Sequence, residues 1–316
     1  MMPLVSIVTA VYNGENYLAE CIESVLAQTY GNWDYVIVDN CSTDKTLEIA
    51  QAYAGRDKRI RVMRNRLHVG AIENHNIALS HISPDSKYCK VVCADDRIYP
   101  ECIELMVQLA EQYPSVGIVG SYILRGGEIQ HIGLPQTRSV FSGQEVCRLH
   151  LLEKTQVVGA PTSVLYRSDI VRARKEFFPG PLLSADVAAC YRTLRNHDLG
   201  FVHKVLAFLR IHDEALSVGQ ANLRAFWLDR VVLFAQYGRN CLSEEEFAKE
   251  FSRVLDDYYY DVLASAVLKR YPKTFWNYHI GGLNEVGLEI NHVKLMKSVI
   301  HRVCDLVFNP GERHRA

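Results

Sequence analysis

Two adjacent carboxylates, Asp95 and Asp96, follow directly after the apolar residues 91–94. Like charges placed side by side repel, so water, a basic partner or a metal ion must offset their repulsion. One carboxylate could cap the helix that Pro100 predicts, but a cap needs only one. A phosphoryl-acceptor site of the receiver type also gathers acids at strand ends, but it would leave most of the chain unexplained. The third interpretation is a divalent cation that bridges carboxylates to a diphosphate, because magnesium and manganese bind oxygen ligands in this way.

The elements that position these acids are short apolar strands that alternate with amphipathic helices. The predicted strands cover 4–11, 35–39, 60–65, 88–94 and 116–123. This alternation predicts an α/β fold with a mostly parallel sheet and helices on both faces. The first strand ends at Tyr12, the second at Asp39 and the fourth at Asp95 and Asp96. Because ligands of such sheets bind beyond the carboxyl ends of the strands, we expect these side chains to share one edge.

The pattern changes along the chain. Residues 124–221 are less regular, with strand patterns at 163–167 and 201–212 and a helix from about 186 to 196. Beyond 222 only helix patterns occur, at 222–237, 243–270 and 292–308. We therefore predict two domains: residues 1–220, which carry the chemistry, and a helical region 221–316 for packing, acceptor or oligomer contacts.

Composition restricts the possible partners. The net charge is −1, from 35 basic and 36 acidic residues, so no global field favours nucleic acid. The nine cysteines form no C-x-x-C pair, which indicates reduced thiols rather than a zinc site or a disulfide framework. The N-terminus lacks a basic secretory region, and no run of 18 apolar residues occurs. These features predict a cytoplasmic protein.

Six segments of the chain carry recognisable motifs. The most specific is VSIVTAVYNGENYLAECIESVLAQTYGNWDYVIVDNCSTDKT, residues 5–46. The next are NRLHVGAIENHNIALSH (65–81) and CADDRIYP (93–100), followed by SVLYRSDI (163–170), SADVAACYRTL (184–194) and LRIHDEALS (209–217). Together these segments resemble the inverting family-two nucleotide-sugar glycosyltransferases, which have a GT-A-type (Rossmann-like) fold. The resemblance spans roughly residues 3–220 and implies a GT-A-type catalytic domain there.

The resemblance implies a donor-nucleotide site. Its residues would be Thr9, Val11, Tyr12, Asp39, Gly70, Asn76 and Asp95. The Tyr12 ring would lie close to the nucleobase, and Asp39 would accept a hydrogen bond from it. Asp95 would reach the ribose or the metal side.

The resemblance also implies the catalytic parts. Asp96 would coordinate Mn²⁺ or Mg²⁺ against the diphosphate, and His212 would lie near it in an R-x-H-x-x-x-x-S pattern that ends at Ser217. A divalent cation stabilises the charge that develops on the departing diphosphate. Asp186 would be the base that takes the proton of the acceptor hydroxyl. Attack in line from the opposite face inverts the anomeric carbon, so no protein nucleophile is needed.

Three positions depart from the family pattern. Cys93 stands where many members carry an acid, Asn40 replaces the second acid after Asp39, and Ala185 replaces the glutamate before Asp186. Plainer interpretations also exist for the acids. Asp39 could cap the helix that begins near Ser42, and Asp186 could be a helix N-cap. His212 could be an ordinary surface histidine.

The sequence thus predicts a metal-dependent, inverting, hexosyltransferase-like glycosyltransferase. It would move a sugar from a nucleoside-diphosphate sugar to a hydroxyl of a saccharide or lipid-linked saccharide, in surface polysaccharide or glycolipid synthesis. One alternative is a non-catalytic nucleotide- or sugar-binding scaffold on the same fold. Another is a sugar-1-phosphate nucleotidyltransferase, which would need a glycine-rich loop and a basic residue after the first strand; TAVYNGENY has neither.

The last predicted helix carries a narrow apolar seam. Val293, Met296, Ile300, Val303 and Val307 follow at steps of three and four residues. The plain interpretation is a helix packed on its own domain. The alternatives are a homodimer through the C-terminal helices or a peripheral contact with the inner face of the membrane.

Overall fold

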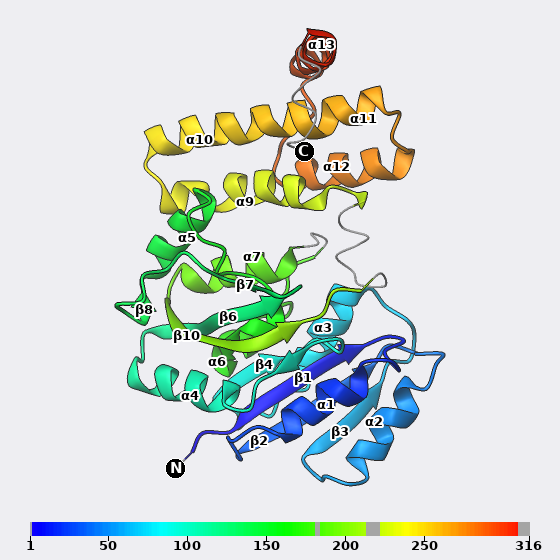
Figure 1. Ribbon diagram of the computed structural model, residues 1–316, viewed down its shortest axis with the longest axis vertical. Helices are drawn as coiled ribbons and strands as arrows, with labels where there is room; N and C mark the ends of the chain where they lie inside the picture. Colours follow the sequence, from blue (N-terminus) through cyan, green and yellow to red (C-terminus); the bar gives the residue numbers. More distant parts are fainter. Residues whose placement is uncertain (1, 181–183, 213–221, 309–316) are drawn as a thin grey trace. The chain divides into compact units, whose positions relative to one another are not determined.

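The computed structural model describes residues 2–180, 184–212 and 222–308. The chain divides into two compact units, Met1–His212 and Asp213–Ala316 (Figure 1). The boundary predicted near residue 220 falls in 213–221, outside the described residues, and so does Ser217. Each unit is therefore described by itself.

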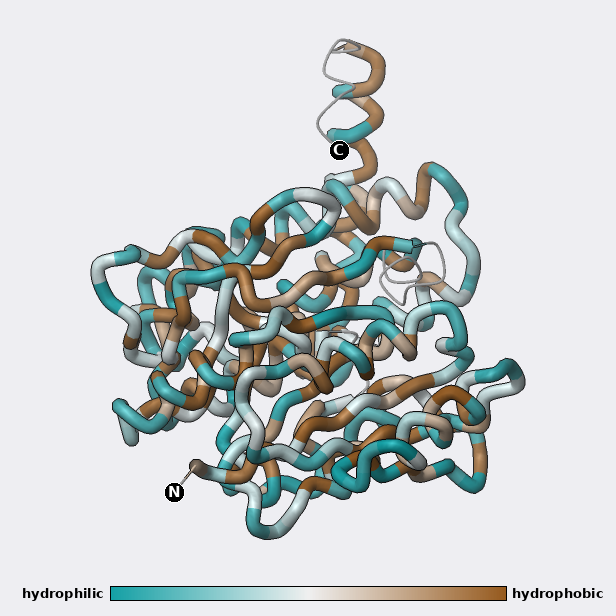
Figure 2. Tube along the Cα trace, turned by 60° about the horizontal axis from the view of Figure 1, so that its bottom comes forward, coloured by the Kyte–Doolittle hydropathy of each residue, from teal (hydrophilic) through white to brown (hydrophobic). Residues whose placement is uncertain are grey.

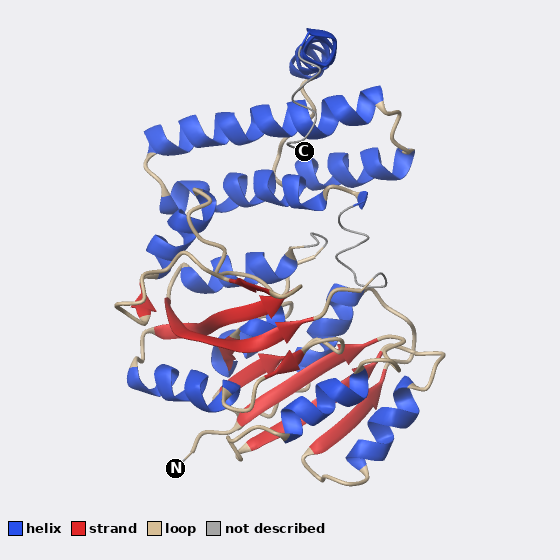
Figure 3. Cartoon of the chain, in the orientation of Figure 1, coloured by secondary structure: helices blue, strands red, loops and turns tan. Residues whose placement is uncertain are grey.

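The first unit is built on a ten-stranded sheet (Figure 3). The strand order is β3-β2-β1-β4-β9-β6-β10-β5, with β7 beside β6 and β8 beside β10. In the described residues the strands are β1 (Val5–Val11), β2 (Trp33–Asp39), β3 (Ile60–Arg64), β4 (Tyr88–Val91), β5 (Arg97–Ile98), β6 (Val116–Arg125), β7 (Glu128–Gln130), β8 (Val140–Phe141), β9 (Leu165–Arg167) and β10 (Asp198–Leu209).

The six longest strands run in one direction. β1 pairs in parallel with β2 and β4, β2 with β3, and β6 with β10. β9 is antiparallel to both β4 and β6, so those two strands share a direction. The short strands β5, β7 and β8 are also antiparallel to their neighbours. The prediction of a mostly parallel α/β sheet is confirmed, and the carboxyl ends of β1, β2, β4 and β10 meet at one edge.

Helices cover both faces of this sheet. In the first unit they are α1 (Leu18–Leu26), α2 (Thr46–Ala54), α3 (Ala71–Ser80), α4 (Cys102–Gln112), α5 (Gly143–Leu151), α6 (Ser168–Arg172) and α7 (Ala185–Leu194). Alternate residues of β1 point to opposite faces, so Val5, Ile7 and Val11 pack in one core with α1, α2 and α4. Hydrophobic (brown) and hydrophilic (teal) stretches alternate along the chain trace (Figure 2).

The second unit is helical. Its elements are α9 (Ala225–Cys241), α10 (Glu244–Asp257), the π-helical turn η2 (Tyr258–Ala264), α11 (Ser265–Leu268), α12 (Lys273–Glu285) and α13 (His292–Phe308). The predicted 243–270 helix is interrupted by η2, where buried Tyr258 bonds His279 at 2.7 Å. The sequence reasoning missed α12. Within the described ranges, no helix is both long and apolar enough to cross a membrane.

The last helix, α13, keeps its apolar seam exposed. It is fixed to η2 by Arg302, which donates to the Tyr260 carbonyl and to Asp261, both at 3.0 Å. Exposed seam residues are Val293 (67%), Met296 (59%), Ile300 (59%), Val303 (41%) and Val307 (62%). The plain interpretation is therefore wrong for the seam, because the described part of the second unit leaves it uncovered.

Candidate functional site

The loops that follow β1 and β2 are joined by hydrogen bonds. The Asn13 N–H donates to the Ser42 hydroxyl at 3.0 Å, and the Thr43 N–H donates to the Asn13 side chain at 2.9 Å. Asn13 has a left-handed backbone with φ of 49°, which asparagine tolerates better than most residues. Together these contacts give the edge of the sheet a fixed shape.

Asp39 ends β2 and is fully buried. Its two oxygens accept from the Ser42 N–H at 3.2 and 3.3 Å, and one lies 3.3 Å from Nε of Arg64. The carboxylate therefore shapes the loop before α2, but it does not cap that helix, because α2 begins at Thr46 after Lys45 and has no side-chain cap. Its predicted contact with a nucleobase stays a proposal.

Tyr12 and His68 form an aromatic pair at the edge of the sheet. Their ring centroids are 4.4 Å apart, and Tyr12 is 49% exposed. Asn40 holds the 65–70 loop in place, because its amide donates to the Val69 carbonyl at 2.8 Å and accepts from the Val69 N–H at 3.0 Å. Gly70 then precedes α3 as its N-cap residue. Because about half of the Tyr12 side chain is exposed, its ring could stack on a planar ligand. His68, which contacts Tyr12, was not predicted as a site residue.

Three predicted nucleotide-site residues turn their side chains inward. The Thr9 hydroxyl is fully buried and donates to the Val92 carbonyl at 2.7 Å, while Val11 belongs to the core. The Asn76 amide bonds the Phe178 N–H at 2.9 Å and its carbonyl at 2.8 Å. Strand alternation directs the side chains of Thr9 and Val11 to the α1 side of the sheet. The prediction that Thr9, Val11 and Asn76 line or border a nucleotide stays a proposal.

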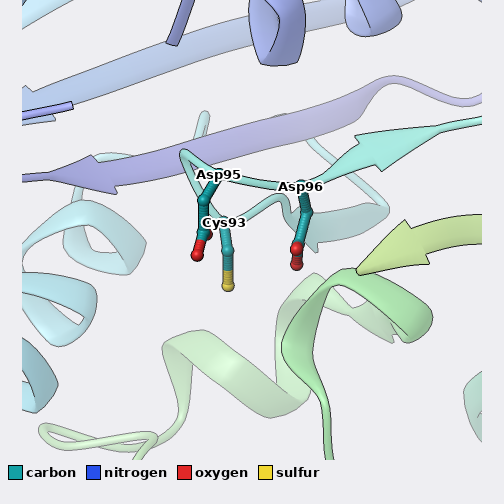
Figure 4. A group of neighbouring side chains, drawn as sticks. All are labelled: Cys93, Asp95 and Asp96. Atoms are coloured by element: carbon teal, nitrogen blue, oxygen red, sulfur yellow. The ribbon is translucent and has the colours of Figure 1, made fainter. Parts of the chain in front are cut away.

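Three side chains lie together just after β4. The ligand atoms of Cys93, Asp95 and Asp96 are all within 4.8 Å of one another. Figure 4 shows all three pointing the same way from this loop. Burial of the Cys93 thiol raises its pKa well above the ordinary value. The Cys93 N–H donates a hydrogen bond to the Thr162 hydroxyl at 3.0 Å, which helps to hold this loop in place.

Asp96 is the inner acid of this group, with 6% of its surface exposed. One oxygen accepts from the Thr162 hydroxyl at 2.6 Å, and the other accepts from the Arg210 N–H at 3.2 Å. Burial, followed by the charge of Asp95, raises the pKa of Asp96 to about 7. Both carboxylate oxygens are therefore already engaged by the protein.

Asp95 is the outer acid, with a side chain 32% exposed. Nε2 of His212 lies 3.0 Å from one of its oxygens. Nδ1 of His212 is buried and has no hydrogen-bond partner among the residues that the structure describes. The His212 ring packs on Tyr17, with centroids 4.7 Å apart. The structure thus pairs His212 with Asp95 rather than with Asp96.

This group fits a divalent cation. Asp95 and Asp96 offer the carboxylate oxygens that manganese and magnesium sites use, and Nε2 of His212 lies beside Asp95. The Cys93 sulfur adds a softer donor, which manganese tolerates better than magnesium. Among the described residues Nδ1 of His212 also has no partner, which is uncommon for a buried polar atom.

Asp186 lies in the first turn of α7. One oxygen accepts from the Ala160 N–H at 2.7 Å, and burial raises the pKa of its carboxyl. The neighbouring Gly159 has φ of +98°, and a Cβ there would lie 3.3 Å from the Asp186 carboxylate. A buried acid with a raised pKa is a suitable general base, because its basicity is higher than that of an exposed carboxylate.

Sequence reasoning missed the residues that support the acids. Arg210 donates to the Asp95 carbonyl at 3.1 Å and forms an ion pair with Glu20. Arg210 is the first residue of the R-x-H pattern that contains His212, so the sequence could have identified it as a site residue. Thr162, in the short 3-10 turn Pro161–Ser163, gives no such signal, because only the folded chain brings it to Asp96.

The order of the strands and the acids at their carboxyl edge define a GT-A-type fold of the nucleotide-sugar-dependent enzymes. A family model described as Glycosyl transferase family 2 matches residues 6–174, which is more than half of the 316 residues. The chain therefore belongs to glycosyl transferase family 2.

Curated relatives agree with this membership. An uncharacterized glycosyltransferase of Haemophilus influenzae is 36% identical over 121 residues, which are 38% of this chain and 37% of that protein. Glycosyltransferase GlyG of Streptococcus pneumoniae is 34% identical over 122 residues, 39% of this chain and 40% of GlyG. The matches thus span only about two fifths of the length of these relatives.

Solved structures share the fold. S. aureus TarS 1-349 in complex with UDP-GlcNAc has a TM-score of 0.68 at 16% identity, covering 99% of this chain and 93% of that one. The mannosyltransferase PcManGT from Pyrobaculum calidifontis, in complex with GDP-Man and Mn²⁺, has a TM-score of 0.56 at 14% identity, covering 96% and 88%. At these identities the likeness concerns the fold.

Proposed function

We propose that this chain is a metal-dependent, inverting glycosyltransferase that uses a nucleoside-diphosphate sugar. The observation that carries the proposal is the group of Asp95, Asp96 and His212 after β4, beside the parallel strand β1, whose end carries the Tyr12–His68 pair. Donor complexes of the two structural neighbours, with UDP-GlcNAc and with GDP-Man and Mn²⁺, support this class of donor.

For the nucleotide, we propose that the base stacks on Tyr12 and bonds the Asp39 carboxylate. Tyr12 offers a half-exposed ring, and Asp39 lies at the neighbouring strand end. The main chain of Thr9 and Val11 would form the floor of this pocket, with Gly70 and Asn76 shaping its border.

For the metal, we propose Asp95 and His212 as ligands of Mn²⁺ or Mg²⁺. The outer carboxylate is accessible, whereas both oxygens of Asp96 already accept hydrogen bonds. Asp96, the metal ligand that the resemblance implies, holds the loop from its inner side through these hydrogen bonds and would face the cation beside Asp95. A bound cation would supply Lewis-acid stabilisation of the departing diphosphate.

For proton transfer, we propose Asp186 as the base. Its buried carboxylate is held by the Ala160 N–H and can accept the proton of an acceptor hydroxyl as that oxygen attacks the anomeric carbon. Attack from the face opposite the diphosphate inverts the configuration.

The biological setting is also a proposal. We propose a hydroxyl of a saccharide or a lipid-linked saccharide as acceptor, in surface polysaccharide or glycolipid synthesis. We place the protein in the cytoplasm, at the inner face of the membrane. For α13, the three-and-four spacing of its exposed seam favours a second copy of this chain as the partner.

The test is transfer from a nucleotide sugar by wild type and by Asp186→Asn. Asparagine keeps the shape of the side chain but accepts no proton, so we expect kcat to fall about 100- to 10,000-fold while donor binding is unchanged. Wild-type rates in the variant would place the base elsewhere. Binding without turnover or donor hydrolysis by the wild type would favour the scaffold, and pyrophosphate release from a nucleoside triphosphate would favour the nucleotidyltransferase.

A further inference from the structure

Lys90, in β4, is fully buried and has no part in the proposed mechanism. Its side-chain amino group donates to the carbonyls of Thr162 at 2.8 Å and Val164 at 3.4 Å, and it lies 3.8 Å from the Met106 sulfur. Within the described part of the chain it forms no ion pair with a carboxylate. A buried lysine without an acid is costly, and an apolar side chain would pack there at lower cost. These contacts point to a task other than packing.

The amino group of Lys90 holds a short turn at the carboxyl edge of the sheet. Lys90 pairs with Leu165, where the antiparallel strand β9 begins, so the preceding 3-10 turn Pro161–Ser163 lies just past the end of β4. Two left-handed residues precede this turn, Gly159 with φ of 98° and Ala160 with φ of 52°. An alanine keeps such a conformation only when its surroundings hold it. The hydrogen bonds from Lys90 hold the other end of this turn.

The same turn contacts both the metal-site loop and the proposed base. The Thr162 hydroxyl donates to Asp96 at 2.6 Å and accepts from the Cys93 N–H at 3.0 Å. Two residues earlier in the chain, the Ala160 N–H donates to Asp186 at 2.7 Å. A shift of the turn would therefore move the loop of the acids and the base together. A displacement of about 1 Å can lower a reaction rate roughly 100-fold, so such a shift matters for catalysis.

We propose that Lys90 is a positioning residue, which holds the 160–164 turn and through it the carboxylates of Asp96 and Asp186. This inference rests on the proposed function and adds a residue that touches neither donor nor acceptor. Without the amino group, two buried carbonyls lose their donor and the turn can shift. Metal-dependent nucleotide binding and the chemical step then weaken together, which a general loss of stability would not cause.

The test removes the amino group from the buried side chain. Lys90→Met keeps the length in an apolar form, and Lys90→Gln keeps an N–H donor. Val36→Ala is the matched control, since it leaves a cavity in β2, two strands away from β4. Calorimetry measures the affinity for UDP and for GDP with and without Mn²⁺. Hydrolysis of UDP-GlcNAc and of GDP-mannose, in which water replaces the acceptor, measures kcat and KM.

We expect Lys90→Met to reduce the Mn²⁺-dependent gain in nucleotide affinity about tenfold and kcat about 100-fold, with the metal-free affinity unchanged. Lys90→Gln should recover part of both losses. Val36→Ala should lower only the midpoint of thermal unfolding, which is measured for every variant.

Other results would overturn the inference. One loss without the other in Lys90→Met would do so, because a single turn holds both acids. Wild-type values in Lys90→Met, or equal losses in Val36→Ala, would leave Lys90 a purely structural residue. Lys90→Gln serves for the comparison if Lys90→Met does not fold. A wild type that neither binds a nucleotide with Mn²⁺ nor hydrolyses a nucleotide sugar would overturn the proposed function, whereas an active wild type with an unaffected Lys90→Met would overturn this inference alone.

Discussion

At the scale of single residues, the two adjacent acids have different environments. Thr162 and Arg210 engage both oxygens of Asp96, whereas Asp95 meets His212 at the surface. Their mutual repulsion is partly relieved by protonation, since burial and the charge of Asp95 raise the pKa of Asp96 to about 7. The pair therefore combines an inner acid that holds the loop with an outer acid available to a cation.

This difference predicts how stability depends on pH. In the metal-free protein, folded Asp96 keeps its proton up to about pH 7, whereas the unfolded chain loses it near the ordinary 3.8. The folded state binds more protons between these values, so the contribution of Asp96 to stability is lost as the pH rises from about 4 to about 7. Asp96→Asn should remove this pH-dependent loss of stability. The free energy of unfolding would be measured with urea at pH 4.5 and pH 8 for wild type and the variant. The same pH dependence in both proteins would contradict the raised pKa of Asp96.

At the scale of elements, the loops at the sheet edge depend on close backbone packing. A Cβ on Gly14 would lie 2.6 Å from Cγ2 of Val11, at the end of β1. The Gly14 N–H also donates to the Thr46 hydroxyl at 2.7 Å, which joins this loop to α2. The strand end, the loop and the helix thus act as one rigid part.

Gly14→Ala should therefore destabilise the protein by roughly 1–3 kcal/mol, because an added methyl group must displace Val11. The matched control is Gly31→Ala, since nothing lies within 4 Å of a Cβ at Gly31. The control should change the free energy of unfolding by less than about 1 kcal/mol. Equal destabilisation by the two substitutions would show that the contact with Val11 is unimportant.

The elements also show how far the sequence could predict the structure. The apolar periodicity predicted β1, β2, β4 and α13, because burial of a strand or a helix face leaves a local pattern. It missed α12, where Gly281 and Gly282 weaken the helical signal. Because both acids directly follow predicted strands, the sequence also predicted that Asp39 and Asp95 lie at the same edge of the sheet. The contact of Thr162 with Asp96 spans 66 residues and leaves no local trace, so only the fold reveals which acid is buried.

At the scale of the whole molecule, α13 provides an exposed apolar surface. Its seam repeats at three and four residues, and its partly covered side contacts η2 through Arg302. A seam of this period packs well against a second helix of the same kind. We therefore expect self-association through α13.

The double substitution Met296→Glu and Ile300→Glu should convert a dimer into a monomer, because it places charges in the seam. Lys297→Glu, on another face of the same helix, is the matched control and should leave the mass unchanged. Light scattering during size-exclusion chromatography measures both. A monomeric wild type would contradict the dimer, and loss of binding to anionic vesicles in the double variant would identify a lipid surface as the partner instead.

The central claim is that acids at the sheet edge hold a cation, which in turn holds the diphosphate of a nucleotide. Binding of a panel of nucleoside diphosphates, with and without Mn²⁺, to wild type and to Asp95→Ala tests it most directly. We expect one nucleotide to bind wild type at least tenfold more tightly when Mn²⁺ is present, and Asp95→Ala to lose this gain while keeping the weak metal-free binding. Nucleotide binding that is indifferent to Mn²⁺, or a full Mn²⁺ effect in Asp95→Ala, would contradict the claim.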